Sequence, residues 1–262
     1  MFDPARIQRE TFVADVELFE SLPSTNDYAA GRAAAGFSGR PLLVVAEQQT
    51  AGRGRGANRW WSCSGALTFS LLLDELSNAP VARLSLAAGL AICEALRALD
   101  PRLETRLKWP NDVYLDERKV AGILIERIAS APETLILGVG LNVNNRLADA
   151  PDEVRSRAMS LADATGAELS PEQVLIAVLQ HLEAAYAVLD EHPWPTLDRC
   201  RELCLLRGRQ VVIDVGEQQH AGRCLGIDDD GALVIETPAG QSRCATGVVT
   251  SFDRSASAAD RR

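Results

Sequence analysis

The chain has 262 residues, of which 47% are hydrophobic and 24% charged, and its formal net charge is −9. These values predict a soluble globular protein with one sizeable core and a smaller second domain. The negative charge argues against a general binder of nucleic acids or membrane surfaces, and the hydropathy pattern predicts neither a membrane span nor a signal peptide.

Hydrophobic periodicity predicts strands and helices in one large domain, which we place at residues 1–206. Strand patterns cover residues 13–19, 41–47, 66–73, 103–109, 113–115, 119–126 and 134–143, with a hairpin turn at 116–118. Helical patterns cover residues 81–99, 171–190 and 196–205. A further helix should begin at Ser24, because its side chain and that of Asp27 can satisfy each other's backbone donors.

The composition changes near residue 207, where helical patterns give way to short strands. Strand patterns cover residues 209–215, 220–227, 232–237 and 242–249. The segments between them are rich in Gly, Pro and Asp, so we expect a small antiparallel barrel of about five strands at residues 207–254. Residues 255–262 should form a disordered tail.

The six cysteines are scattered and form no CxxC pair, and only three histidines occur. A zinc site needs several cysteine or histidine ligands close together, and this sequence shows no such group. We therefore expect no dedicated metal site in the protein. Reduced thiols are typical of a cytoplasmic protein, which is the location that we predict.

Both lysines of the chain, Lys108 and Lys119, fall in the stretch KWPNDVYLDERKVAGILIE at residues 108–126. A lysine ammonium is compact and can lie between several oxygens, whereas arginine offers a broad planar fork. The predicted hairpin would return Lys119 beside Lys108 at one end of a cavity, and Gly122 would allow a ligand to lie against the backbone. The alternative is an ordinary exposed hairpin with charged ends.

The loop GRGRGANRW at residues 52–60 combines three glycines with three arginines. Glycine allows close approach of the backbone to a ligand, and the arginines could close over an anion. The loop lacks the GK[ST] of a phosphate-binding P-loop, and a strand follows where a dinucleotide fingerprint would need a helix. It could also be a flexible surface loop or an RG-rich nucleic-acid segment.

Two further segments are weaker signals when each is taken by itself. Ser24, Thr25 and Asn26 could recognise a neutral polar group through their donors and acceptors, or could only cap the helix. The segment GVGLNV at residues 138–143 places Asn142 at a strand end after two glycines.

The order of these segments is more specific than any one of them. The succession STN, EQQTAGRGRGANRW, KWPNDVYLDERKVAGILIE, GVGLNV and a small barrel resembles the biotin protein ligases over roughly residues 20–252. The resemblance implies an α+β fold with a mixed sheet, helices on one side of it and a C-terminal SH3-like barrel. Few residues precede the STN segment, so we expect the ligase-only type without an N-terminal DNA-binding domain.

The resemblance also implies roles for individual residues. The biotin-binding residues would be Ser24, Thr25, Asn26, Gln49, Arg53, Gly54, Arg55, Lys119 and Gly122. The ATP-binding residues would be Arg55, Trp60, Lys108, Asn111 and Asn142. Family loops usually read Gly-Arg-Gly-Arg-Arg-Gly-Arg-x-Trp, whereas here Gly56-Ala57 replaces Arg-Gly and Asn58 replaces the last Arg, two residues before the Trp. Arg59 is the candidate substitute near the triphosphate.

The implied reaction joins biotin to ATP, giving biotinyl-5′-AMP, and then transfers biotin to a lysine of a biotin carboxyl carrier protein. Lys119, Arg53 and Asp112 are the candidate catalytic residues, and Mg²⁺ would enter with ATP. We expect no nucleic acid or membrane among the partners, and either a monomer or a homodimer. The alternatives are a lipoate–protein ligase of the same fold and an RG-loop RNA-binding protein, while a DNA-binding repressor would need the additional N-terminal domain.

Overall fold

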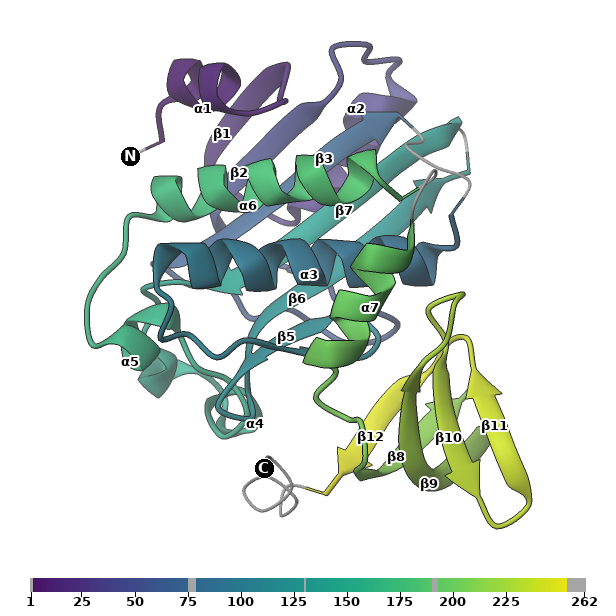
Figure 1. The fold of residues 1–262 in the computed structure, drawn as a ribbon. Helices are drawn as coiled ribbons and strands as arrows, with labels where there is room; N and C mark the ends of the chain where they lie inside the picture. Colours follow the sequence, from purple (N-terminus) through teal and green to yellow (C-terminus); the bar gives the residue numbers. More distant parts are fainter. Residues whose placement is uncertain (1, 75–78, 130, 190–192, 254–262) are drawn as a thin grey trace.

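The structure is a computed structural model, and it describes residues 2–74, 79–129, 131–189 and 193–253 (Figure 1). The predicted tail at 255–262 and the last residue of the predicted helix at 171–190 lie outside these ranges. Within them, no helix combines the length and hydrophobicity that crossing a bilayer requires. All six cysteines carry free thiols.

A seven-stranded sheet forms the centre of the large domain, in the order β1-β2-β3-β7-β6-β5-β4. Its strands are β1 (Asp15–Leu22), β2 (Leu42–Gln49), β3 (Ala66–Asp74), β4 (Arg106–Lys108), β5 (Asp112–Leu115), β6 (Arg118–Ile128) and β7 (Ala131–Asn142). Strands β1 and β2 are parallel, whereas every other neighbouring pair is antiparallel. The expectation of a mixed sheet is therefore confirmed.

Helices cover both faces of this sheet. Helices α3 (Val81–Leu99) and α6 (Pro171–Ala187) lie side by side over one face (Figure 1). Helix α2 (Thr25–Ala34) packs on the opposite face, where it contacts β2, β3 and β7. Buried apolar residues pack on both faces of the sheet, in a larger and a smaller cluster. Leu43 and Val45 of β2 belong to the larger cluster, whereas Leu42 and Val44 belong to the smaller cluster beneath α2. Burial on both faces explains the uninterrupted apolar run in β2 and corrects the expectation of helices on one side only.

Several boundaries differ from the sequence prediction. Helix α1 (Pro4–Glu10) was not predicted, although Asp3 accepts a hydrogen bond from the Ala5 backbone and a proline follows it, a common helix start. Strand β1 begins and ends later than predicted, and β4 is shorter. The hairpin turn contains only Asp116 and Glu117, both with positive φ, so Arg118 already belongs to β6.

Short helical segments connect β7 to α6. They are the 3₁₀ turn η1 (Leu147–Asp149) and the helices α4 (Asp152–Arg155) and α5 (Leu161–Thr165). Ser160 and Asp163 form a capping box at the start of α5, and Gly166 ends that helix with φ +74. The predicted helix at 196–205 is α7 (Pro193–Leu203).

The C-terminal part is a five-stranded antiparallel sheet in the order β11-β10-β9-β8-β12. Its strands are β8 (Gln210–Val215), β9 (Gln218–Ile227), β10 (Leu233–Thr237), β11 (Gly240–Cys244) and β12 (Val248–Phe252). The predicted single strand at 242–249 splits into β11 and β12. Gly247 between them has φ +144, and a Cβ there would lie 2.8 Å from the Asp214 carbonyl oxygen, so this turn requires glycine.

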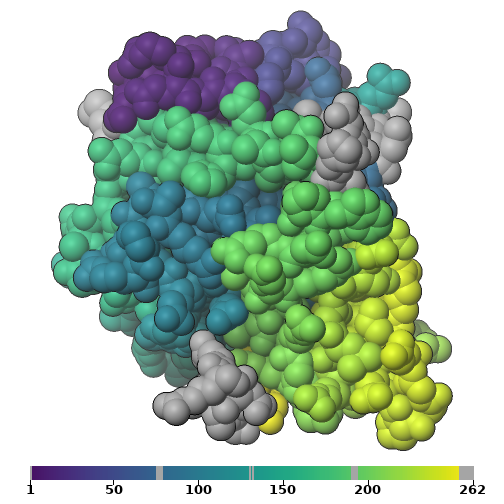
Figure 2. Space-filling model, in the orientation of Figure 1, coloured from purple at the N-terminus to yellow at the C-terminus, as the bar shows by residue number. Residues whose placement is uncertain are grey.

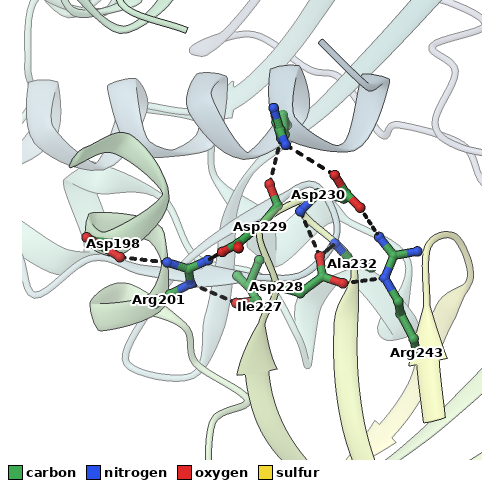
Figure 3. A network of polar contacts seen from close by, with 9 residues as sticks. Asp198, Arg201, Ile227, Asp228, Asp229, Asp230, Ala232 and Arg243 are labelled. Atoms are coloured by element: carbon green, nitrogen blue, oxygen red, sulfur yellow. Dashed lines mark hydrogen bonds and ion pairs between the residues drawn. The ribbon is translucent and has the colours of Figure 1, made fainter. Parts of the chain in front are cut away.

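The turn at residues 228–230 ties the C-terminal sheet to the helices (Figure 3). Arg201 of α7 pairs with Asp229 at 2.5 Å and donates to the Ile227 carbonyl at 2.8 Å. Arg83 of α3 donates to the Asp229 carbonyl oxygen at 2.8 Å. Figure 2 shows the C-terminal sheet (yellow) packed directly against α7 (green). An exposed ion pair contributes little to the free energy of unfolding. The main effect of these contacts is therefore to fix the orientation of the C-terminal sheet relative to α3 and α7.

Trp109 supplies a buried link between the two parts of the molecule. Its side chain is fully buried, and its indole Nε1 donates to the Gly231 carbonyl oxygen at 3.0 Å. The replacement Trp109→Phe would keep most of the apolar volume but leave that carbonyl without its donor. We expect a loss of about 1–3 kcal/mol in the free energy of unfolding, measured by urea titration with circular dichroism.

Trp194→Phe is the matched control, because Trp194 is 51% exposed and should change the unfolding free energy little. Equal unfolding free energies for wild type and Trp109→Phe would show that this hydrogen bond does not stabilise the fold.

Candidate active site

A cleft of about 830 Å³, a volume that includes its open mouth, lies between the large sheet, α2, the 52–60 loop and β12. All predicted site residues but one line it: Ser24, Thr25, Asn26, Gln49, Arg53, Gly54, Arg55, Trp60, Lys108, Asn111, Asp112, Lys119 and Gly122. The exception is Asn142, which is buried and accepts a hydrogen bond from Asn145 Nδ2 at 3.0 Å. The predicted contact of Asn142 with ATP stays a prediction.

The start of α2 forms a hydrogen-bonded polar wall. Gln49 Oε1 accepts from the Thr25 backbone at 2.7 Å and lies 3.1 Å from the Thr25 hydroxyl. Ser70 Oγ lies 2.6 Å from Asn26 Oδ1 and 2.7 Å from Thr25 Oγ1. The sequence interpretation missed Ser70, although a serine inside the apolar strand ALTFSLLL was a readable signal. Ser24 caps the helix by accepting from the Asp27 backbone.

Two glycines of β7 explain the GVG segment. A Cβ at Gly138 would lie 2.1 Å from Asn26 Oδ1, and a Cβ at Gly140 would lie 2.3 Å from Trp60 Cε2. Distances this short leave no room for a side chain, so both glycines are needed for Asn26 and Trp60 to rest on the sheet backbone. The segment therefore shapes the cleft, independently of Asn142.

Lys119 and Asp112 both line the cleft and form an ion pair there. Lys119 Nζ lies 2.6 Å from Asp112 Oδ1, and a Cβ at Gly122 would approach Nζ to 2.9 Å. The Lys119 backbone is held from both sides, because its N–H donates to the Arg157 carbonyl and its carbonyl accepts from the Met159 N–H. Residues 157–159 thus fix the position of Lys119. The sequence did not indicate this contact.

Lys108 lines the cleft as well. Its Nζ donates to the Val249 carbonyl oxygen of β12 at 3.4 Å. Burial lowers the pKa of Lys108, and the nearby charges of Lys119 and Arg157 act in the same direction. Asp112 opposes this effect and favours the charged ammonium. The sequence left open whether the C-terminal part completes the site and did not name Val248 and Val249 of β12, which line the cleft.

The glycine and arginine loop forms a small hairpin over the cleft. Gly54 N–H donates to the Asn58 carbonyl at 2.9 Å, and Trp60 N–H donates to the Gly52 carbonyl at 3.0 Å. Gly56 at the tip has φ +62, and Asn58 Nδ2 donates to the Arg55 carbonyl at 3.0 Å. Asn58, the residue that departs from the usual family loop, therefore lines the cleft and closes the hairpin tip.

The two central arginines of the loop have different partners. Arg53 forms two parallel hydrogen bonds of 2.7 Å to Glu126 and pairs with Asp27 at 2.8 Å. The hydrogen bonds that Arg53 donates to Glu126 raise the pKa of Arg53 most, and the charges of Glu126 and Asp27 act in the same direction. Arg55 reaches the C-terminal sheet and donates to the Gly247 carbonyl at 3.2 Å. Burial lowers the pKa of Arg55.

Family models match two parts of the chain. The Biotin/lipoate A/B protein ligase family matches residues 18–144, and the Biotin protein ligase C terminal domain matches residues 207–253. The two matches cover the large sheet with its cleft and the C-terminal sheet, respectively.

Relatives from several bacteria are similar over most of the chain. A biotin–[acetyl-CoA-carboxylase] ligase of Paracoccus denitrificans is 36% identical, over 83% of this chain and 92% of the relative. The corresponding ligase of Mycobacterium tuberculosis is 37% identical, over 81% of this chain and 80% of the relative. The solved structure of the biotin protein ligase from Aquifex aeolicus in complex with biotin and ATP is 30% identical, with a TM-score of 0.81 over 92% of this chain and 99% of that one. The chain belongs to the biotin protein ligase family.

Proposed function

We propose that this protein activates biotin with ATP, forming biotinyl-5′-AMP, and transfers biotin to a lysine of a biotin carboxyl carrier protein. The observation that carries the proposal is the position of Lys119 beside Asp112, in a cleft whose other walls are the polar start of α2 and the arginine loop. Membership of the biotin protein ligase family supports the same reaction.

The first step requires two anions to approach each other. The biotin carboxylate attacks the α-phosphorus of ATP, a bond forms between carboxylate oxygen and phosphorus, and pyrophosphate leaves. Lys119, Arg55 and Lys108 line the cleft and can offset the repulsion and stabilise the charge as it moves. We assign the biotin carboxylate to Lys119, and the nucleotide to Lys108, Asn111 and Trp60.

Mg²⁺ would supply further positive charge to the phosphates when it enters with ATP. Among the described residues, no three His, Cys, Asp or Glu side chains cluster closely enough to hold a metal ion. The carboxylate of Asp112 is engaged by Lys119. With few side-chain ligands to offer, the cleft suits a metal ion that is bound mainly by phosphate oxygens.

The second step transfers the biotinyl group to an amine. The acceptor lysine attacks the acyl carbon, AMP leaves, and one amine proton must be removed. Asp112 is the candidate to orient that amine or accept its proton. The hairpin over the cleft would protect the mixed anhydride by excluding water.

The polar wall favours biotin over lipoate as the acid. Thr25, Asn26 and Gln49 present several oriented donors and acceptors, which a bicyclic ring system with polar atoms can use and a dithiolane on an aliphatic chain cannot. We also propose that residues 1–206 form the catalytic domain and residues 207–254 the C-terminal domain. The family match at 207–253 supports that boundary.

Biotin-dependent ATP–pyrophosphate exchange tests the proposal directly. We expect exchange with biotin and none with lipoate, measured with labelled pyrophosphate at equal acid concentrations. Exchange with lipoate alone would reassign the substrate within the same chemistry. Exchange with neither acid would reject the adenylation reaction.

Lys119→Ala should slow adenylate formation by on the order of 100-fold or more, because the biotin carboxylate would lose its counter-charge. The measurement is single-turnover formation of the adenylate from ATP labelled at the α-phosphorus. Arg118→Ala is the matched control, since Arg118 is the exposed preceding residue on the same strand. Adenylate formation at the normal rate in Lys119→Ala would remove Lys119 from the reaction.

Arg53→Gly should release the adenylate faster, by on the order of tenfold or more, because two charge-assisted hydrogen bonds that hold the loop would be lost. The measurement is the dissociation rate of preformed adenylate from the enzyme. Ala57→Gly is the control, because it adds the flexibility of one glycine at the exposed loop tip without removing an ion pair. An unchanged release rate would contradict a closing role for Arg53.

A further inference from the structure

Glu126 connects the loop over the cleft to the polar wall of the cleft. Its Oε1 accepts from Arg53 Nη1 at 2.7 Å, and its Oε2 accepts from Arg53 Nη2 and from Asn26 Nδ2, both at 2.7 Å. The carboxylate is half-buried, with 31% of the side chain exposed. Glu126 itself does not line the cleft, but both of its partners do.

The contact with Asn26 determines which way that amide faces. An asparagine side chain presents an acceptor at one end and donors at the other, and its neighbours decide between the two orientations. An ionised carboxylate can only accept, so Glu126 at 2.7 Å, helped by the more distant Leu124 carbonyl oxygen at 3.5 Å, fixes the Asn26 Nδ2 group on its side. Oδ1 is thereby turned toward the Ser70 hydroxyl, at 2.6 Å.

Glu126 stays ionised at neutral pH. Burial raises its pKa, but the hydrogen bonds from Arg53 and Asn26 outweigh this effect, and the pKa lies below its ordinary value. The ionised carboxylate therefore pairs with the charged guanidinium of Arg53 and accepts the hydrogen bond from Asn26 Nδ2.

We infer that Glu126 is a positioning residue for biotin, which fixes the amide of Asn26 for the biotin ring and holds the loop shut through Arg53. This inference rests on the proposed function. It assigns one carboxylate outside the cleft to two tasks, recognition of the acid and retention of its adenylate.

The effects of two substitutions separate this role from a merely structural one. Glu126→Gln is isosteric, but its single oxygen cannot accept all three bonds, and its NH₂ group would face a donor. Glu126→Asp is shorter, yet it keeps the charge and can only accept. If Glu126 mattered only for packing, Gln would be tolerated better than Asp. If it positions Asn26 and Arg53, Asp should be tolerated better than Gln.

Asp27→Asn is the matched control, because Asp27 also pairs with Arg53 and is 55% exposed, but among the described residues the Asn26 side chain bonds to Glu126, Leu124 and Ser70 and not to Asp27. We expect Glu126→Gln to raise the biotin dissociation constant about tenfold or more, Glu126→Asp to raise it less, and Asp27→Asn to change it less than about twofold. The maximal rate of exchange at saturating biotin should fall much less than the affinity in Glu126→Gln.

Biotin binding is measured by titration without ATP, adenylate release is measured from preformed complex, and thermal unfolding checks that each variant is folded. Wild type that binds and activates biotin, with a Glu126→Gln affinity within twofold of it, would overturn the inference and leave the proposed function standing. A larger loss of affinity in Glu126→Asp than in Glu126→Gln would overturn it as well. Wild type that neither binds biotin nor supports exchange would reject the proposed function itself, and the inference with it.

Discussion

The cleft depends on two places in β7 where the sheet carries no side chain. Gly138 and Gly140 lie on a central strand of a sheet that is buried on both faces, and any Cβ there would collide with Asn26 or Trp60. Because both walls of the cleft rest on this backbone, a single added methyl group would have to displace the start of α2 or the arginine loop. The close approach leaves the polar atoms of these segments facing a common space.

The electrostatics of the cleft are opposite to those of the whole molecule. A chain with a net charge of −9 gathers Lys108, Lys119 and its loop arginines around one cavity. Carboxylates hold these cations in position, as Asp112 does for Lys119 and Glu126 does for Arg53. Cations that are oriented before a substrate arrives need little rearrangement when negative charge develops, which is the physical basis of electrostatic preorganisation.

The C-terminal sheet is part of this arrangement and not a separate appendage. Val248 and Val249 of β12 line the cleft, and main-chain oxygens at Gly247 and Val249 accept from Arg55 and Lys108. Trp109 and the ionic contacts of the 228–230 turn fix how this sheet lies against α3 and α7. A cleft built from two parts of the chain is sensitive to their relative orientation, so contacts far from the bound substrate can affect its binding.

The sequence by itself determined the positions of most strands and helices, and all but one of the site residues that it predicted line the cleft. It did so because these signals are local: the two lysines, the glycine and arginine loop, and the Ser24 helix start each form a short pattern, and their order is specific. What only the tertiary structure decided depends on strand pairing over long distances. That pairing placed α2 on the second face, brought Ser70 and Glu126 to Asn26, joined Asn142 to Asn145 and added β12 to the lining of the cleft. Side chains alternate between the two faces of a strand, so a residue's place in the site follows from a register that distant segments fix together.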